Sequence, residues 1–333
     1  MGSRRSGKVI LSNDPKIRFG KRYQVRITAV HKPASKKRGY FEVEYVGPSK
    51  LTFDDSIYVD PDVVNKLEVL LLAARAILLD GPQGCGKTVL AGKLAQAMEW
   101  ELIVFNCSIV FDPTDMLARP EIRSTASGGV ETAWVATNVL RTLEAAIKDP
   151  TRQFLIFLDE FSRVARPNAV NMILSGIDST RQLHNPITGA NIRIPDNVHW
   201  IAAVNTGSQV VGAVPIDPAA LDRFAPIKME YLPEAEELRL LAMRYPEVPK
   251  AKISRVVRIA NAIRKNKAGR MDLSMRATDE ACLLLTHPHF EAQDDFSVIL
   301  RDSFCSRFDG RWDDPVSDAG TVWRIIEGMA KMK

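Results

Sequence analysis

The segment 81–88, GPQGCGKT, combines closely spaced glycines with a lysine and a threonine. It fits the pattern G-x-x-x-x-G-K-[ST], which is typical of phosphate-binding loops. Glycines let backbone N–H groups converge on phosphate oxygens, Lys87 would supply positive charge, and the Thr88 hydroxyl would ligate Mg²⁺. Cys85 is interpreted as a small space-filling residue, although its oxidation would block the loop. The residues predicted to form this cofactor site are Gly81, Pro82, Gln83, Gly84, Cys85, Gly86, Lys87, Thr88 and Val89.

Two carboxylates, Asp159 and Glu160, directly follow the uniformly apolar run 154–158. Parallel α/β sheets present ligand-binding groups at the carboxyl ends of their strands. Taken alone, such a pair is better explained as a solvated strand end, but together with the loop at 81–88 it predicts the second half of one site. We expect Asp159 to hold Mg²⁺ with Thr88, and Glu160 to act as a general base on an attacking water.

The elements that must position these residues alternate between strand and helix patterns. Apolar strand candidates lie at 76–79, 102–105, 154–158, 200–204 and 227–231, and helical stretches separate several of them. Alternation of this kind predicts an α/β core over 59–232, with a parallel sheet sandwiched by helices. After Pro233 only helical patterns follow, at 234–245, 253–266, 276–286, 296–308 and 322–332, which predicts an all-helical lid over 233–333.

Residues 1–58 differ from the rest of the chain. Period-two alternation at 23–29 and 41–45 predicts two half-buried strands joined by a basic loop, after a basic tail. The whole chain has a net charge of +5, but residues 1–50 alone carry +10 and the remainder −5. The small basic N-terminal β unit is therefore expected to meet an acidic partner.

The order of the motifs over about residues 60–310 resembles the AAA+ ATPases, and within them the MoxR-like and dynein-related branch. Residues 159–163, DEFSR, resemble that branch's D-E-[IF]-x-R, and 201–205, IAAVN, resemble the strand that ends in a polar sensor. The run 217–224, DPAALDRF, resembles A-x-L-D-R-F, and 274–276, SMR, resembles the S-x-R of the lid. The core is also similar to the ATPase subunit of cobalt and magnesium chelatases.

This resemblance implies further roles for single residues. Asn205 would orient the lytic water, and Arg276 would be a second sensor of the nucleotide. Arg223 would be the arginine finger, acting on the site of a neighbouring subunit in a homo-oligomeric ring, which the resemblance implies to be a hexamer. Arg163 is either a second interface arginine or a surface charge. The implied cofactors are ATP and Mg²⁺; ATP is favoured over GTP because residues 205–210 lack the N-T-x-D-R-S-like run of the GTP-using relatives.

Two insertions also resemble this branch. Residues 128–134 are expected to form a hairpin over a central pore, and 180–195 a hairpin that precedes the sensor strand; a surface loop without substrate contact is the alternative for both. The branch often has a G-P-L-like segment where this chain has 136–140, ATNVL. That departure concerns the engagement of a substrate and leaves nucleotide binding unaffected.

Several functions agree with these features. The leading hypothesis is a ring-forming ATPase that remodels or activates a partner protein, as MoxR-like chaperones do with proteins that carry a von Willebrand factor A domain. A chelatase-type ATPase subunit is a narrower version. The alternative is a motor that engages nucleic acid through residues 1–50, with lysines and arginines on phosphates and aromatic side chains as stacking surfaces. Against this, the favoured interpretation of the same residues is that the aromatic side chains fill the small β core and the basic side chains are solvated. In a third reading, the basic arm docks on an acidic protein face.

Composition and cysteine usage limit the compartment. With 46% hydrophobic and 26% charged residues, the chain is neither collagenous nor wholly disordered. It lacks an apolar run of about 18 residues, and its start lacks the apolar core of a secretory signal. The four cysteines form no CxxC pair, so no zinc or redox motif is indicated. We expect a cytoplasmic protein with no membrane partner.

Overall fold

The computed structural model describes residues 23–31, 40–48, 51–124, 128–164, 171–178, 180–205, 218–266, 272–287 and 295–330, the first two ranges by their backbone alone. The predicted basic tail lies outside the described residues. So do residues 206–217, which include most of the run 205–210 and the first residue of the motif at 217–224. The predicted N-terminal strands are present as β1, Tyr23–His31, which pairs antiparallel with β2, Tyr40–Pro48.

Five parallel strands form the central sheet, which confirms the predicted α/β fold. They are β3, Ile77–Gly81; β4, Glu101–Asn106; β7, Phe154–Asp159; β10, Val198–Asn205; and β11, Ala225–Lys228. Their order is β11-β3-β10-β7-β4. The strand predicted at 227–231 is wrong in its bounds: β11 ends at Lys228, which pairs with Asp80, because its partner β3 turns away into the loop after Gly81.

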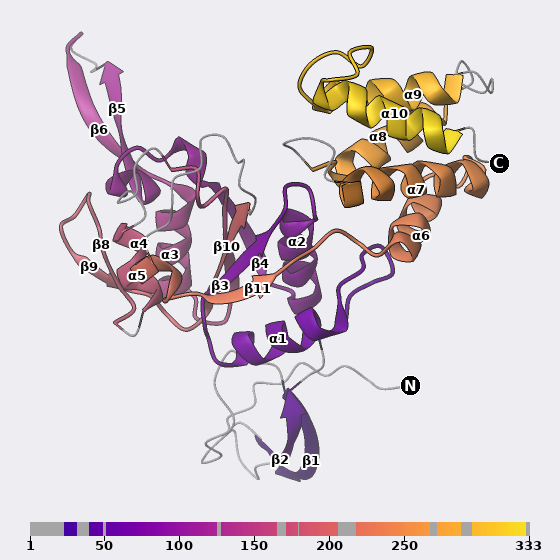
Figure 1. Ribbon diagram of the computed structural model, residues 1–333. Coiled ribbons are helices and arrows are strands. Elements are labelled where there is room, and N and C mark those ends of the chain that lie inside the picture. The colour runs from indigo at the N-terminus through magenta and orange to yellow at the C-terminus, as the bar shows by residue number, and fades with distance from the viewer. Residues whose placement is uncertain are drawn as a thin grey trace.

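Helices cover both faces of this sheet, as side-chain alternation along the strands requires (Figure 1). On one face, α1, Pro61–Leu72, and α2, Lys87–Met98, pack on a cluster that includes Leu79 and Phe157. On the other, α3, Asn138–Lys148, and α4, Asn171–Ile177, pack on Leu78 and Leu158. Leu51, which the sequence analysis grouped with the N-terminal β unit, belongs to the first cluster.

The C-terminal helices have a hydrophobic core of their own. They are α6, Glu234–Arg244; α7, Lys250–Asn266; α8, Met275–Leu284; α9, Asp295–Phe304; and α10, Asp318–Ala330. Buried side chains recur at helical spacing along α7, at Ile253, Val256, Val257 and Ala260. The helix predicted at 296–308 ends earlier, because the chain tightens into a 3₁₀ turn at Cys305–Arg307. The helix predicted at 322–332 starts earlier, at Asp318.

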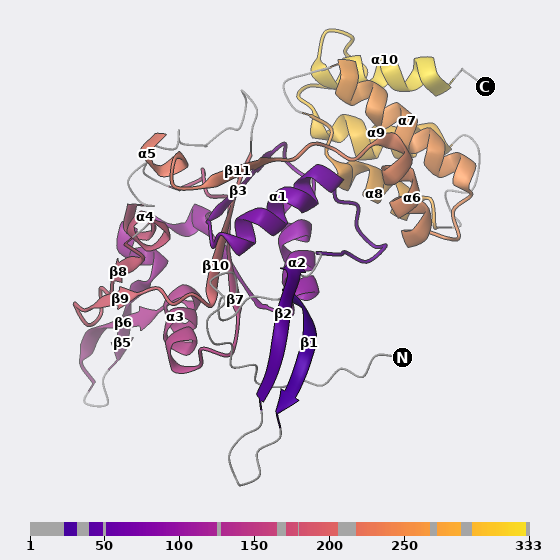
Figure 2. The ribbon, with the colours of Figure 1, turned by 90° about the horizontal axis from the view of Figure 1, so that it is seen from below.

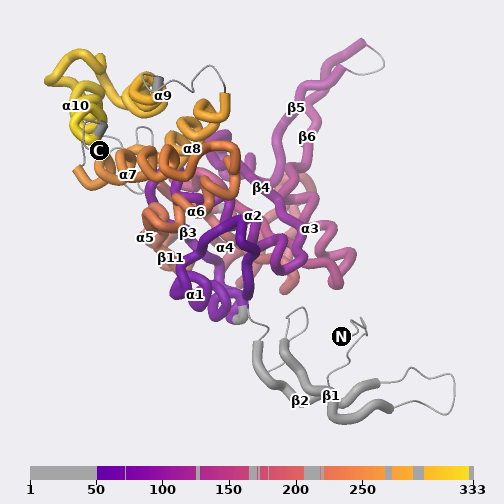
Figure 3. The backbone as a smooth tube through the Cα atoms, turned by 90° about the vertical axis from the view of Figure 1, so that its right-hand side faces the viewer, coloured from indigo at the N-terminus to yellow at the C-terminus, as the bar shows by residue number. Residues whose placement is uncertain are grey.

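Both predicted insertions are hairpins. The first is longer than expected, because β6, Val130–Ala136, pairs along its whole length with β5, Ala118–Ser124. The second joins β8, Gln182–His184, to β9, Asn191–Arg193. The lid helices lie on one side of the sheet and both hairpins on the other, and the β5–β6 hairpin projects from the body (Figures 2 and 3). Within the described residues, no helix combines the length and apolar character needed to cross a membrane.

Candidate functional site

The loop after β3 has the backbone shape that its glycines permit. Gly84 and Gly86 have left-handed φ angles of 75° and 99°, which side-chain-bearing residues rarely adopt. Gly81 allows close approach of another segment, since a Cβ there would lie 2.4 Å from the carbonyl oxygen of Met229. α2 starts directly after Gly86 and has no side-chain cap. Its first N–H groups and the positive end of its dipole are therefore available to an anion.

Lys87 folds back across this loop. Its Nζ donates hydrogen bonds of 2.8 Å to the carbonyl oxygens of Gly81 and of Pro82. The side chain is only 7% exposed, and this burial lowers the pKa of Lys87, while Cys85 and Asp159 act in the opposite direction. The ammonium group is thus fixed beside the point where the loop and the α2 N-terminus would meet a phosphate.

Thr88 and Asp159 form the link between the loop and β7. The Thr88 hydroxyl donates to Asp159 Oδ2 over 3.1 Å, across 71 residues of sequence. A hydroxyl and a carboxylate are oxygen ligands of the type that Mg²⁺ takes together with substrate phosphates. These two residues therefore fit a magnesium ion that also contacts a bound phosphate.

Glu160 sits at a sharp turn directly after β7. Its φ is 51°, an uncommon left-handed value for a glutamate, and its N–H donates to Asp159 Oδ1 over 2.9 Å. The carboxylate Oε1 accepts from Arg163 Nη1 at 3.3 Å. Arg163 was expected to be either an interface arginine or a surface charge. In the structure, it contacts Glu160 of its own chain.

A cavity of about 570 Å³ connects these groups. Its lining includes the loop from Gln83 onward, the carboxylates Asp159 and Glu160, and Asn205, whose strand position pairs with Gly81. The lid contributes Arg276 from α8. The structure thus gathers Lys87, Thr88, Asp159, Glu160, Asn205 and Arg276, far apart in sequence, around one space.

The order of strands explains this convergence, because β3, β10 and β7 are neighbours and all three end at the same edge of the sheet. Comparison with models of known protein families indicates which class of site this is. Residues 76–224, from the start of β3 through α5, Pro218–Leu221, match the model described as the AAA domain of the dynein-related subfamily. This segment, a little under half of the chain, is similar to the AAA domain of this subfamily. The predicted AAA+ branch is thereby confirmed.

Among the curated proteins that are similar to this chain are several from staphylococci. Uncharacterized proteins of Staphylococcus aureus and Staphylococcus haemolyticus are 30% identical over 173 residues, and one from Staphylococcus saprophyticus is 28% identical. The alignment covers 52% of this chain and 62% of each relative, so the chain spans less than two thirds of their length. Among solved structures, two RuvB mutants of Thermotoga maritima align at 17% identity with TM-scores of 0.45 and 0.46; they cover 75% and 74% of this chain, which covers 71% and 70% of theirs.

Arg223 is placed differently from the other predicted residues of the AAA domain. It is not among the residues that line the cavity. Its Nε lies 3.9 Å from Asp178 Oδ2, in an ion pair in which the arginine side chain is 36% exposed. Within its own chain, this arginine does not line the cavity, and its predicted action on a neighbouring subunit stays a prediction.

The cavity also has walls that the sequence analysis did not identify. Residues 56–60, before α1, line one side, and Tyr231 and Glu237 line the side toward the lid. The sequence signal for Tyr231 was weak, since its position was assigned to the end of a strand. Cys85 is buried, and this burial raises its pKa, in agreement with a space-filling role.

Proposed function

We propose that this protein binds ATP with Mg²⁺ and hydrolyses it to ADP and phosphate. The observation that carries the proposal is the contact between Thr88 and Asp159 beside the buried ammonium group of Lys87. A carboxylate, a hydroxyl and a fixed positive charge on a glycine-rich loop are what a nucleotide triphosphate with its magnesium ion requires. The family-model match supports the same class of site.

Each residue of the cavity has a task in this proposal. The loop N–H groups and Lys87 bind the β- and γ-phosphates, and Thr88 and Asp159 hold Mg²⁺. A magnesium ion held there would supply positive charge for the phosphate oxygens. Glu160 accepts a proton from the attacking water, which Asn205 orients at the neighbouring strand end. Arg276 contacts the phosphates from the lid side.

The contact with Arg163 gives Glu160 a resting position. The hydrogen bond from the Arg163 guanidinium group orients this carboxylate. It must turn from Arg163 toward the water for proton transfer, and the 3.3 Å distance indicates a contact that can be exchanged. The proposed general base therefore lies beside the cavity, close to its working position, before ATP arrives.

We also infer that hydrolysis takes place in a homo-oligomeric ring, a hexamer by family resemblance. Arg223 lies outside the cavity of its own chain, so a neighbour must receive it if it is to act as a finger. A guanidinium group at the γ-phosphate stabilises the transition-state charge and raises related hydrolysis rates by about 10³–10⁵. The ring is proposed to remodel or activate a partner protein, with a von Willebrand factor A domain protein as one candidate.

The β5–β6 hairpin supports a protein partner. Opposed residues on one face of this ribbon include Ile122 with Thr132, Ser124 with Val130, and Pro120 with Trp134. Ile122, Val130 and Trp134 are all exposed, while charged residues such as Arg123 and Glu131 oppose each other on the other face. An apolar exposed face fits a protein surface better than a phosphate backbone.

A nucleic-acid partner is the second candidate, carried by the +10 charge of residues 1–50. The two candidates differ in their response to salt. Binding of DNA or RNA through lysines and arginines would weaken steeply with increasing salt. Deletion of residues 1–50 would remove such binding, and unchanged affinity of the shortened chain would exclude this segment as the nucleic-acid site.

The experiment that tests the ATPase proposal is phosphate release by the full chain with ATP and Mg²⁺. Wild-type protein is expected to turn over ATP, and to lose turnover when Mg²⁺ is chelated. GTP is measured in parallel, and slower turnover of GTP is expected. Absence of both ATP binding and phosphate release at millimolar ATP would refute the proposal.

A further inference from the structure

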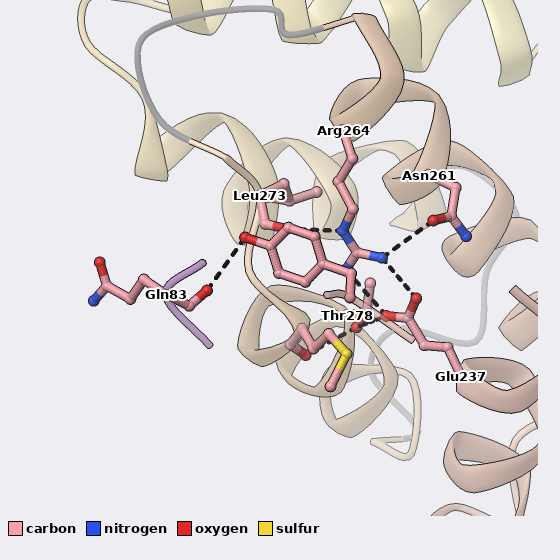
Figure 4. A network of polar contacts seen from close by, with 8 residues as sticks. Gln83, Glu237, Asn261, Arg264, Leu273 and Thr278 are labelled. Carbon is pink, nitrogen blue, oxygen red and sulfur yellow. Dashed lines mark hydrogen bonds and ion pairs between the residues drawn. The ribbon is translucent and has the colours of Figure 1, made fainter. Parts of the chain in front are cut away.

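The lid contains a buried ion pair between α6 and α7 that takes no part in the proposed chemistry. Arg264 of α7 donates to both carboxylate oxygens of Glu237 of α6, over 2.6 Å and 3.1 Å (Figure 4). The two side chains are only 6% and 3% exposed. A buried pair of this kind contributes little net stability, but its directional bonds fix the elements that carry it.

Tyr231 connects this ion pair to the phosphate loop. Its ring lies against the guanidinium group of Arg264, 4.8 Å from carbon to ring centroid. Its hydroxyl donates to the backbone oxygen of Gln83 over 3.2 Å. Burial raises the pKa of Tyr231, so the phenol stays protonated and remains a donor near neutral pH. One side chain thus touches the loop with its hydroxyl and the lid with its ring.

The same ion pair also fixes the start of α8. Arg264 Nε donates to the carbonyl oxygen of Leu273 over 2.8 Å, and the Thr278 hydroxyl donates to Glu237 Oε1 over 2.7 Å. Ser274 and Arg276 lie between these two anchored positions. Ser274 packs on the phosphate loop itself, since a Cβ on Gly84 would lie 2.7 Å from the Ser274 Cβ. The lid therefore meets the loop at two points, and both are tied to Arg264.

We propose that Tyr231 is a positioning residue that couples the state of the phosphate loop to the placement of Arg276. The inference rests on the proposed function of that loop in ATP binding. When phosphates order the loop, the Gln83 carbonyl holds Tyr231, Tyr231 holds Arg264, and Arg264 holds the chain on either side of Arg276. The lid then follows the loop as one body. The contacts of Tyr231 and Arg264, and not the flexibility of the Arg276 side chain, then place Arg276 at the nucleotide.

Tyr231→Phe in the full chain is the direct test, because it removes one hydroxyl and keeps the ring on Arg264. ATP affinity, steady-state turnover and hydrogen exchange of residues 81–86 and 272–287 are measured with and without ATP and Mg²⁺. We expect the dissociation constant for ATP to change less than about 3-fold and kcat to fall about 5- to 10-fold, the size of one lost hydrogen bond. Protection of 272–287 by ATP is expected in the wild type and absent in the variant.

Tyr245→Phe is the matched control. Tyr245, the residue after α6, is a buried tyrosine, and its hydroxyl donates over 3.0 Å to Asp279 of α8. This hydroxyl contacts the lid and not the phosphate loop, so the Tyr245→Phe variant should retain the ATP-dependent protection of 272–287. A second comparison uses Arg276→Ala: if Tyr231 acts through Arg276, Tyr231→Phe should lower kcat less than twofold in that background.

Several outcomes would overturn the coupling. Wild-type kcat in Tyr231→Phe, ATP-dependent protection in that variant, or additive effects with Arg276→Ala would each contradict it. Failure of the wild type to bind ATP would instead refute the proposed function. The coupling would still be tested then by exchange without nucleotide, where Tyr231→Phe should speed exchange of 81–86 and Tyr245→Phe should not.

Discussion

The nucleotide cavity and the surface around Arg223 differ in how far a single chain completes them. Around the cavity, Lys87, Thr88 and Glu160 each contact a named partner at 2.8 to 3.3 Å. Arg223 pairs with Asp178 at 3.9 Å, beyond ordinary hydrogen-bond length, and is partly exposed. The nucleotide cavity is thus assembled within one chain, whereas the guanidinium group of Arg223 is partly accessible at the surface.

This difference separates binding from hydrolysis. The pair of Arg223 with Asp178 is partly exposed, and surface ion pairs contribute only about 0–1 kcal/mol, so we expect Arg223 to exchange this contact for one on a neighbouring subunit. Lys87 cannot leave its buried position without exposing the loop carbonyl groups that it satisfies. We therefore expect one chain to suffice for ATP binding, and a neighbour to be needed for turnover.

The largest expected effect comes from Arg223→Ala. Removing the guanidinium group should lower turnover by about 10³-fold or more and leave ATP affinity within about 3-fold, because this residue lies outside the cavity. Phosphate release and equilibrium ATP binding measure the two quantities. Arg152→Ala, which removes another exposed arginine paired with a carboxylate, Glu101, is the control and should retain activity. A parallel loss of ATP binding in Arg223→Ala would contradict the separation.

Glu160→Gln should follow, with turnover lower by about 10²–10⁴-fold and ATP binding retained. Glutamine keeps the size of the side chain and the turn after β7, but it accepts no proton at neutral pH. Single-turnover phosphate release measures the chemical step. Glu99→Gln is the control, because Glu99, at the end of α2, also has a left-handed φ, of 55°. This variant should retain turnover. Turnover of Glu160→Gln within twofold of the wild type would exclude Glu160 as the general base.

Lys87→Ala should weaken ATP binding by at least about 100-fold, because charge-assisted contacts to two phosphates are lost. Isothermal titration measures the affinity. Lys93→Ala, on the same helix, is the control. Lys93 pairs with Asp54 and is not among the residues that line the cavity. Only the first variant should lose binding, and tight ATP binding by Lys87→Ala would refute the phosphate-loop assignment.

The smallest effect is expected from Thr88→Val, which removes a hydroxyl and keeps the side-chain volume. The Mg²⁺ concentration for half-maximal turnover should rise about 10-fold, because one oxygen ligand is lost. Titration of turnover with Mg²⁺ measures it. Thr142→Val is the control, since that hydroxyl donates to Asn138 within α3. An unchanged Mg²⁺ requirement would place the metal elsewhere.

The sequence predicted the cavity better than its surroundings. The loop at 81–88 and the carboxylates after 154–158 follow from local spacing and from parallel-sheet topology, and the structure places them together. The left-handed turn at Glu160 and its contact with Arg163 were not predictable, because tertiary packing decides them. The same holds for β5, whose charged and proline-containing sequence gives no strand signal by itself.

The lid shows the limit most clearly. Helical periodicity predicted its helices, but no pattern indicated that Glu237 and Arg264 pair across two of them. The apolar pattern predicts that Tyr231 ends a strand. In the structure it lies between β11 and α6, and its hydroxyl donates to the backbone oxygen of Gln83. Such contacts join residues far apart in sequence and of ordinary type, so they become visible only once the fold brings them together.

Mixing two inactive variants tests the central claim most directly. Lys87→Ala subunits bind no ATP but keep Arg223, and Arg223→Ala subunits bind ATP but lack the finger. If Arg223 serves a neighbouring site, mixtures should recover turnover, with a maximum at an intermediate ratio. Mixtures of Lys87→Ala with Glu160→Gln should recover none, since no site then holds both ATP and a base. Absence of recovery at every ratio of the first pair, with both proteins in one assembly, would contradict the account.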